Sequence, residues 1–340
     1  MNELASLRDL GEALDHELRG PSPRLRHKVI TDIGGRPGRA RRGLPRRGLG
    51  WRLVVTAGLA VALAGALLLA PALRLWRASP AATAQAADIL RLAAIAAENQ
   101  PALIPRPSQF IFVESAETAA AMTGDSSGRT TSVHMKSDLY EVWNSASGTR
   151  NGLQREQARS PGNLGQPAGA WQTTVLPGCR DGRSAHVAGA AGVLPAGRCV
   201  PQPAYPRGLP SSARAMLAYL YRNRHGQNPA AVQAFITAGD LIRESYVRPA
   251  ALAALFTAVA QIPGVSVADH AVNVTGQHGV AVQQTYHGIS EQLIFNQLTH
   301  AFIGERQVAV SASSGLSVGT VLDSTAILRL AVVDHAGQLP

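Results

Sequence analysis

Lysine is almost missing from this chain: Lys28 and Lys136 stand against 30 arginines. A bias of this kind is typical of a GC-rich genome, so the formal net charge of +10 is weak evidence for an acidic partner. Cysteine is equally scarce, with two residues and no CxxC pair, which removes support for zinc or thioredoxin chemistry. The chain also lacks an HExxH motif, a Walker A loop and a dinucleotide fingerprint. We therefore expect no cofactor, no metal site and no catalytic activity.

One long apolar run is present. Leu53–Leu73 holds 21 residues without a charge, and as a helix it would cover about 30 Å, the thickness of a bilayer's hydrocarbon core. Only Arg74 and Arg77 follow it closely. Seven arginines precede it: Arg36, Arg39, Arg41, Arg42, Arg46, Arg47 and Arg52. Because cytoplasmic flanks carry the basic excess, we expect a single-pass protein of the cell membrane, with a cytoplasmic N-terminus and an extracellular C-terminal domain.

A cleaved signal peptide is the alternative reading of this run, with Ala82–Ala84 as its small-residue cleavage site. The apolar core is longer than the roughly 7–15 residues typical of a signal peptide. In addition, 52 residues precede it, and Arg74 and Arg77 lie between the core and the cleavage site. An uncleaved transmembrane helix is therefore favoured. No cysteine follows the run until Cys179, which excludes a lipoprotein.

The basic excess lies next to the expected membrane span. Residues 1–52 hold 12 basic and 6 acidic residues, whereas residues 74–340 hold 20 and 16. Anionic lipid attracts a basic segment in this position. The arginine run has no interleaved aromatic residues and no recognisable binding fold, so we expect no nucleic-acid partner.

The chain divides into four segments. Residues 1–52 form a cytoplasmic tail with a short amphipathic helix and an Arg-rich linker, 53–73 the transmembrane helix, 74–87 a linker, and 88–340 an exported domain. The leucines of the tail recur at spacings of three and four: Leu4, Leu7, Leu10, Leu14 and Leu18. A lone helix of this size is marginal in water. It lies on the membrane, pairs with a protein or stays partly disordered.

The sequence pattern of the exported segment predicts an α+β fold, with antiparallel strands first and last and a helical segment inserted between them. Asp88 is positioned to cap a first helix that ends near Asn99, and Leu209–Gln261 reads as three helices. Strands are expected near residues 109–114, 131–135, 139–143, 171–176, 265–268, 279–286, 291–296, 307–313 and 325–334.

Both cysteines fall in the expected exported segment, where disulfides form and persist. A bridge between Cys179 and Cys199 would close a loop of about 20 residues and contribute about 3 kcal/mol by loop-closure arguments. Two separate buried thiols are the alternative. We predict a disulfide between Cys179 and Cys199.

Two short motifs have ordinary structural explanations. Gly315–Gly319 spells the GxSxG motif of serine hydrolases around Ser317, but no helix is expected after it, so a glycine- and serine-rich hairpin loop is favoured. Asn273–Thr275 spells a glycosylation sequon, which we attribute to chance.

The strand Tyr140–Trp143 alternates, so Tyr140 and Val142 share one face and Trp143 lies on the other. We expect one of these faces to be buried under the helical segment. The apolar residues that would cover it recur at helical spacing: Leu217, Leu220, Leu252, Leu255, Phe256 and Val259. The alternative is that these side chains line a ligand cavity.

Several sequence pieces carry a family resemblance: Tyr140–Trp143, Leu209–Pro210, Ala215–Leu220, Leu241–Glu244, Arg248–Pro249, Ala253–Phe256, Ile262–Val265, Gly279–Val282, Leu293–Asn296, Gly304–Glu305 and Val332–Pro340. As a set, the chain resembles an uncharacterised family of actinobacterial single-pass membrane proteins commonly encoded beside an RNA polymerase sigma factor. It departs from the family pattern at Gly276–Gly279 and Asn296. The family provides no catalytic residues to carry over.

The β–α–β order is also similar in architecture to the extracytoplasmic LolA and RseB-type folds. Those are curved antiparallel sheets with helices over the concave face, and they bind lipids or signalling proteins. This similarity is one of architecture, which says little about function.

Three functions follow as hypotheses. The leading one is a membrane-anchored sensory or accessory protein, whose exported domain binds a lipid or protein ligand and whose tail contacts a sigma factor or another regulatory protein. The second is a membrane-tethered carrier of lipid or lipoprotein, which would need a large apolar cavity under the helices. The third, a hydrolase using Ser317, is the least supported.

Overall fold

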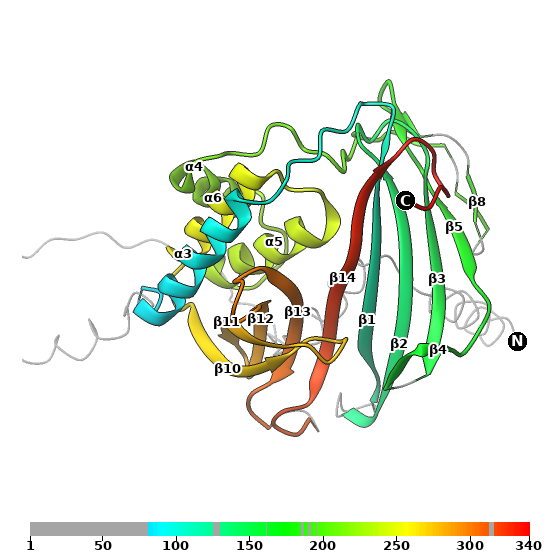
Figure 1. Ribbon diagram of the computed structural model, residues 1–340. Coiled ribbons are helices and arrows are strands. Elements are labelled where there is room, and N and C mark those ends of the chain that lie inside the picture. Colours follow the sequence, from blue (N-terminus) through cyan, green and yellow to red (C-terminus); the bar gives the residue numbers. More distant parts are fainter. Residues whose placement is uncertain are drawn as a thin grey trace, which may run out of the picture.

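The computed structural model describes residues 81–124, 130–160, 162–184, 187–189, 192–194, 196–312 and 316–340. Their main feature is one antiparallel sheet of ten strands in the order β10-β11-β12-β13-β14-β1-β2-β3-β4, with β5 also paired to β3. The helices gather over β10 to β13, and β1 to β5 extend the sheet beyond them (Figure 1). The α+β class expected from the sequence is confirmed.

The helices are α3 (Ala84–Glu98), α4 (Ala213–Arg222), α5 (Ala230–Glu244) and α6 (Pro249–Val259). The first strands are β1 (Phe110–Gly124), β2 (Thr130–Ser145), β3 (Gly152–Ser160), β4 (Asn163–Pro167) and β5 (Gln172–Leu176). Two short hairpins follow, β6 (Cys179–Arg180) with β7 (Arg183–Ser184), and β8 (Val187–Gly189) with β9 (Gly192–Leu194). The last strands are β10 (Ser266–Val272), β11 (His278–Tyr286), β12 (Ile289–Phe295), β13 (Phe302–Ala309) and β14 (Val321–Val333).

The first hairpin is longer than the sequence predicts. The separate strands expected at 131–135 and 139–143 are one strand, β2, which pairs with β1 along its whole length. The polar residues between them stay in the ladder because they find partners across it: Thr118 lies opposite Ser137, with their hydroxyl oxygens 3.1 Å apart. The sequence also predicts 171–176 as the one clear strand between 144 and 208, and β3, β4 and β6 to β9 correct that expectation.

The first described helix begins earlier than expected. Thr83, not Asp88, caps α3, because its Oγ1 accepts a hydrogen bond from the Ala86 amide at 3.2 Å. The Thr83 amide in turn donates to the Val265 carbonyl at 2.9 Å. The start of α3 is therefore fastened to the residue just before β10.

Helices α4, α5 and α6 confirm the three helices expected in Leu209–Gln261. Together with α3 they bury the largest apolar cluster against β11 and β12. Phe256 on α6 is 1% exposed, and its ring meets Phe295 of β12 edge-on with centroids 5.2 Å apart. These helical residues thus fill a core and do not line an open apolar cavity.

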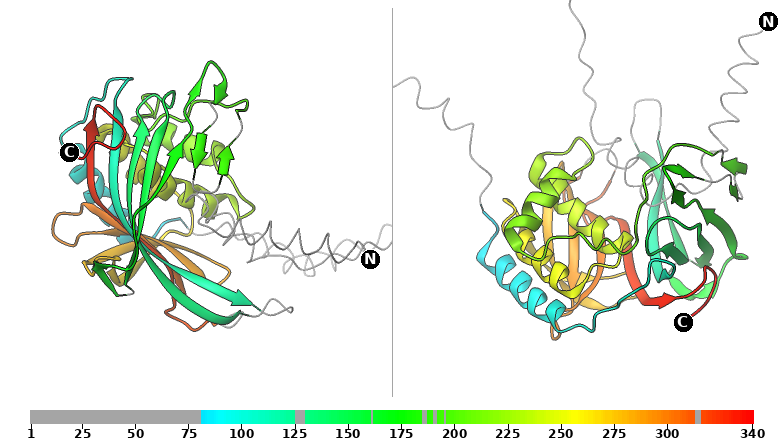
Figure 2. Two further views of the ribbon diagram at one scale, coloured as in Figure 1. Left: turned by 90° about the vertical axis from the view of Figure 1, so that its right-hand side faces the viewer. Right: turned by 90° about the horizontal axis from the view of Figure 1, so that it is seen from above.

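The strands of the sheet that the helices do not cover have an apolar cluster of their own. Trp143 packs with Phe110, Phe112 and Val333 on one face, and its indole Nε1 donates to the Gln338 carbonyl of the C-terminal segment. The helices lie to one side of these strands when the molecule is seen from above (Figure 2). The expectation that α4 and α6 cover the Tyr140–Trp143 strand is therefore wrong, because β14 and β1 separate β2 from the helix-covered strands.

Among the described residues no helix is both long and apolar enough to cross a membrane. The predicted span 53–73, the tail 1–52 and most of the linker 74–87 lie outside the described residues. They stay predictions.

Candidate functional site

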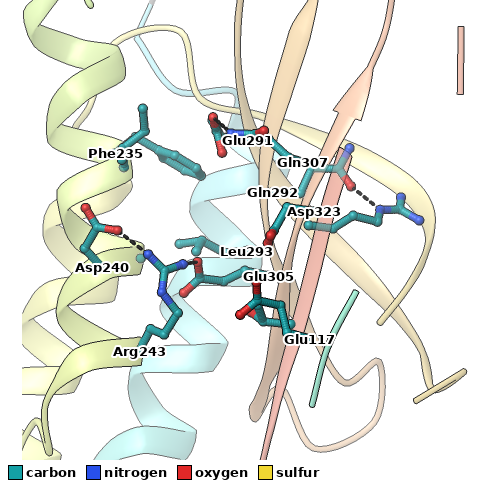
Figure 3. A pocket seen from close by; sticks show the side chains of 14 residues that line it. Glu117, Phe235, Asp240, Arg243, Glu291, Gln292, Leu293, Glu305, Gln307 and Asp323 are labelled. Atoms are coloured by element: carbon teal, nitrogen blue, oxygen red, sulfur yellow. Dashed lines mark hydrogen bonds and ion pairs between the residues drawn. The ribbon is translucent and has the colours of Figure 1, made fainter. Parts of the chain in front are cut away.

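A narrow polar slot lies between α5 and the sheet (Figure 3). Its volume is about 50 Å³, and it is lined from β12, β13, β14, β1 and α5. Five of the described lining residues are acidic: Glu117, Asp240, Glu291, Glu305 and Asp323. Because five carboxyl groups gather beneath one helix, we take this acidic slot as the candidate functional site.

Strand alternation places these side chains on one face. Glu291 is in register with Gln307, and Gln307 with Asp323, so the three form a row across β12, β13 and β14. A second row joins Glu305 to Thr325. Because side chains alternate between the two faces of a strand, both rows point to the side on which α5 packs.

Helix α5 closes the slot with one face. Phe235, Ile236, Gly239, Asp240 and Arg243 recur at helical spacing, and all five line it. Phe235 and Ile236 are buried, at 1% and 5% exposure, and anchor the helix to the core. The same stripe that buries apolar residues therefore also brings a carboxylate and a guanidinium against the sheet.

Arg243 ties α5 to the sheet. Its Nη1 donates to Glu305 Oε2 at 2.7 Å, and its Nη2 donates to Asp240 Oδ1 (Figure 3). Gly239 makes room for this contact, since a Cβ at that position would lie 3.1 Å from Glu305 Oε2. Burial raises the pKa of Glu305, and the neighbouring Arg243 offsets part of that effect. Burial lowers the pKa of Arg243, but Glu305 and then Asp240 raise it by more.

Glu291 is a second carboxyl group of the slot whose pKa is raised. Burial raises its pKa to about 8, and the charges of Asp323 and Glu305 add to this, while a hydrogen bond from Gln307 Nε2 at 2.5 Å acts the other way. Glu291 is therefore mostly protonated at neutral pH. A protonated carboxyl group therefore lies in the same slot as the hydrogen-bonded Arg243 and Glu305.

Glu291→Gln should flatten the dependence of stability on pH. The folded-state pKa of about 8 lies above the ordinary glutamate pKa of 4.5, so the wild-type protein loses stability as pH rises between these values. Glutamine has no proton to lose. We expect equal melting temperatures near pH 4 and a variant stabilised by about 2 kcal/mol above pH 7, at 1.36 kcal/mol per pKa unit discounted for partial exposure. Thermal unfolding from pH 4 to 9 measures this, and parallel curves would contradict it.

Arg306, the residue after Glu305 in β13, makes its hydrogen bonds on the opposite face of the sheet. Arg306 Nε donates to Gln292 Oε1 at 3.0 Å, next to a hydrogen bond from Ser290 Oγ to Gln283 Oε1. Burial lowers the pKa of Arg306. Its guanidinium is therefore committed to this polar row.

Two buried polar atoms at the slot, Gln307 Oε1 and Arg243 Nε, have no hydrogen-bond partner among the described residues. One water occupies about 30 Å³ of liquid, so the slot has room for a water or a small polar group. No group of three or more His, Cys, Asp or Glu in the described segments is arranged to hold a metal ion. The slot can therefore bind or release a proton at Glu291, and it holds the Arg243–Glu305 contact beneath α5.

The predicted disulfide is present. Cys179 and Cys199 are bonded, with their Cα atoms 5.8 Å apart. The bridge lies at the β6–β7 hairpin, outside the residues that line the acidic slot.

The two motifs singled out in the sequence are also outside the slot. Ser317 is exposed in the loop between β13 and β14, and the next element is a strand. Asn273 is 5% exposed, and its amide is used within the fold: Nδ2 donates to the Ile303 carbonyl, and Oδ1 accepts from the Thr275 amide.

Sequence reasoning missed the acidic slot. Glu291 lies between Ser290 and Gln292, and Glu305 between Gly304 and Arg306, and polar neighbours of this kind usually mark an exposed part of a strand. The available signal was on α5, where Asp240 and Arg243 continue the stripe of Phe235 and Ile236. A charged pair inside an apolar helical stripe indicates buried polar partners.

No family model matches this chain, and no curated protein matches it. One solved structure to which it is similar is the MucA/MucB complex of Pseudomonas aeruginosa, with 13% sequence identity and a TM-score of 0.26. The match covers 76% of this chain and 59% of that chain. A TM-score this low carries no argument, so the family suggested by the sequence stays a prediction.

Proposed function

We propose that this protein is a membrane-anchored extracytoplasmic sensory or accessory protein that binds its ligand or partner without transforming it. Its exported domain is the described α+β fold. Its cytoplasmic tail contacts a sigma factor or another regulatory protein. The leucine-rich tail, the arginine-flanked apolar run and the sequence resemblance support this arrangement.

The acidic slot is the observation that carries the binding role. Replacing a buried ion pair by packed apolar residues often leaves the free energy of unfolding unchanged or raises it. Stability alone therefore does not explain why α5 is attached to the sheet through Arg243, Glu305 and Asp240. Such a contact depends on charge, unlike the apolar contacts of α6. We therefore assign α5 as the element whose attachment to the sheet responds to a bound partner or to proton concentration.

The lipid-carrier alternative finds less support. A site for a ligand of drug size occupies about 300–1,000 Å³ and is mostly apolar. The slot under α5 is about 50 Å³ and acidic, and the buried apolar residues of the helices form one packed cluster with those of β11 and β12. No observation on the helix-covered strands favours an acyl chain there.

Co-purification of the full chain from cross-linked cells tests the tail contact. The matched control lacks residues 2–33 and keeps Arg36 to Arg52, so the signals for membrane orientation remain. We expect a sigma factor or regulatory protein to co-purify with the full chain and to be lost with the control. Identical partners from both chains would contradict the proposed link.

A further inference from the structure

A second hollow, which we call the arginine hollow, lies between the β2–β3 loop and the β6–β7 hairpin. Its volume is about 540 Å³. Among the described residues that line it, three are arginines and none is acidic. The arginines are Arg150 from the loop and Arg180 and Arg183 from the hairpin. It shares no lining residue with the acidic slot.

Specific contacts hold the two walls of this hollow together. The Cys179 amide donates to the Gly148 carbonyl at 2.9 Å, and the Gly178 amide donates to Asn151 Oδ1 at 2.9 Å. A Cβ on Gly178 would lie 2.3 Å from the carbonyl carbon of Arg150, so only glycine allows the hairpin to approach so closely.

The disulfide fixes the hairpin itself. Cys199 is bonded to Cys179, and its amide donates to the carbonyl of Gly182, in the turn that joins β6 and β7, at 3.0 Å. Arg180 and Arg183, which stand on either side of this turn, are held at defined positions although their side chains are exposed.

Arg150 is oriented before any ligand arrives. Its Nη1 donates to the Ser108 carbonyl, and its guanidinium carbon lies 5.0 Å from the centroid of the Phe110 ring. An arginine has five N–H donors. The Ser108 contact therefore uses one of the N–H donors of Arg150 and leaves the others for a ligand.

We propose that the arginine hollow binds a phosphate group carried by a polar molecule. Guanidinium groups pair with phosphate oxygens through two parallel hydrogen bonds, and three of them match the charge of a phosphate dianion better than that of a single carboxylate. Among the described residues that line the hollow, none has an aliphatic or aromatic side chain that could hold an acyl chain. The hollow is also larger than one phosphate, which leaves space for the polar body to which the phosphate is attached.

Calorimetric titration with inorganic phosphate, on the full chain in phosphatidylcholine nanodiscs, tests this site. We expect a dissociation constant of about 1 mM or tighter for the wild-type protein. Arg180→Gln with Arg183→Gln should weaken binding about tenfold or more, since each removes charge-assisted hydrogen bonds. The control, Arg91→Gln with Arg214→Gln on α3 and α4, removes the same charge and should change affinity less than about twofold.

Three results would overturn the proposal: no heat of binding to the wild-type protein, equal losses in both double variants, or full affinity in the Arg180 and Arg183 variant. Cys199→Ser should also weaken phosphate binding, because it frees the hairpin that carries two of the arginines. Adding phosphatidylglycerol vesicles then identifies the source of the phosphate. Competition assigns a lipid headgroup, and its absence assigns a soluble phosphate compound.

Discussion

Replacing Phe256 by alanine should lower the free energy of unfolding by about 3–5 kcal/mol. The side chain is 1% exposed on α6 and meets Phe295 edge-on in the cluster that joins four helices to the sheet. Its removal loses apolar burial and leaves a cavity that close-packed neighbours fill only in part. Thermal unfolding of the full chain, followed by circular dichroism, should show a decrease of about 10 °C, at about 2–4 °C per kcal/mol for this size.

Leu298→Ala is the matched control for Phe256→Ala. Leu298 is 90% exposed, so its truncation should change stability by less than about 0.5 kcal/mol. If Phe256→Ala cost under about 1 kcal/mol, the packed core beneath the helices would be refuted, and the carrier hypothesis with its apolar cavity would regain support.

Arg243→Met should also cost about 3–5 kcal/mol at neutral pH, because it leaves Glu305 and Asp240 against the core without their cation. The loss should be smaller near pH 4. Burial already raises the pKa of Glu305, and removing Arg243 raises it further, so the carboxyl group becomes neutral at low pH and its penalty disappears. Denaturant unfolding at pH 4 and pH 8 measures both effects.

Two comparisons separate this loss from a general effect of removing an arginine. Arg91→Met breaks an exposed pair with Asp88, in which Arg91 is 62% exposed, and should cost less than about 1 kcal/mol. Arg243→Met combined with Glu305→Met should recover part of the stability, because apolar side chains can replace a buried pair. A double variant as unstable as Arg243→Met would show that the Arg243–Glu305 pair is not what attaches α5.

The elements with strong periodicity were predictable from the sequence. Gly226–Pro229 and Val247–Pro249 separate the helices: Pro229 is the N-cap of α5, and Pro249 is the first residue of α6, a position that proline favours. β2 was harder to predict. Its polar residues Lys136–Asp138 read as a gap, but pairing with β1 satisfies their backbone groups and carries the strand through.

The disulfide was predictable because the chain has just two cysteines and the membrane reading places both outside the cell. The acidic slot and the arginine hollow were not. Glu291 and Glu305 line the same slot as Arg243 only when α5 packs on the sheet. Arg150 and Arg183 line the same hollow only when the hairpin packs on the β2–β3 loop. Contacts between residues so distant in sequence leave no periodic pattern within either segment.

The proposed function depends first on the domain lying outside the membrane on a single N-terminal anchor. Protease added to intact protoplasts tests this most directly, with antibodies against the tail and against the C-terminal segment. The account predicts that residues 88–340 are degraded and that only a small fragment containing the tail and Leu53–Leu73 survives. Survival of the whole chain until the protoplasts are lysed would contradict it.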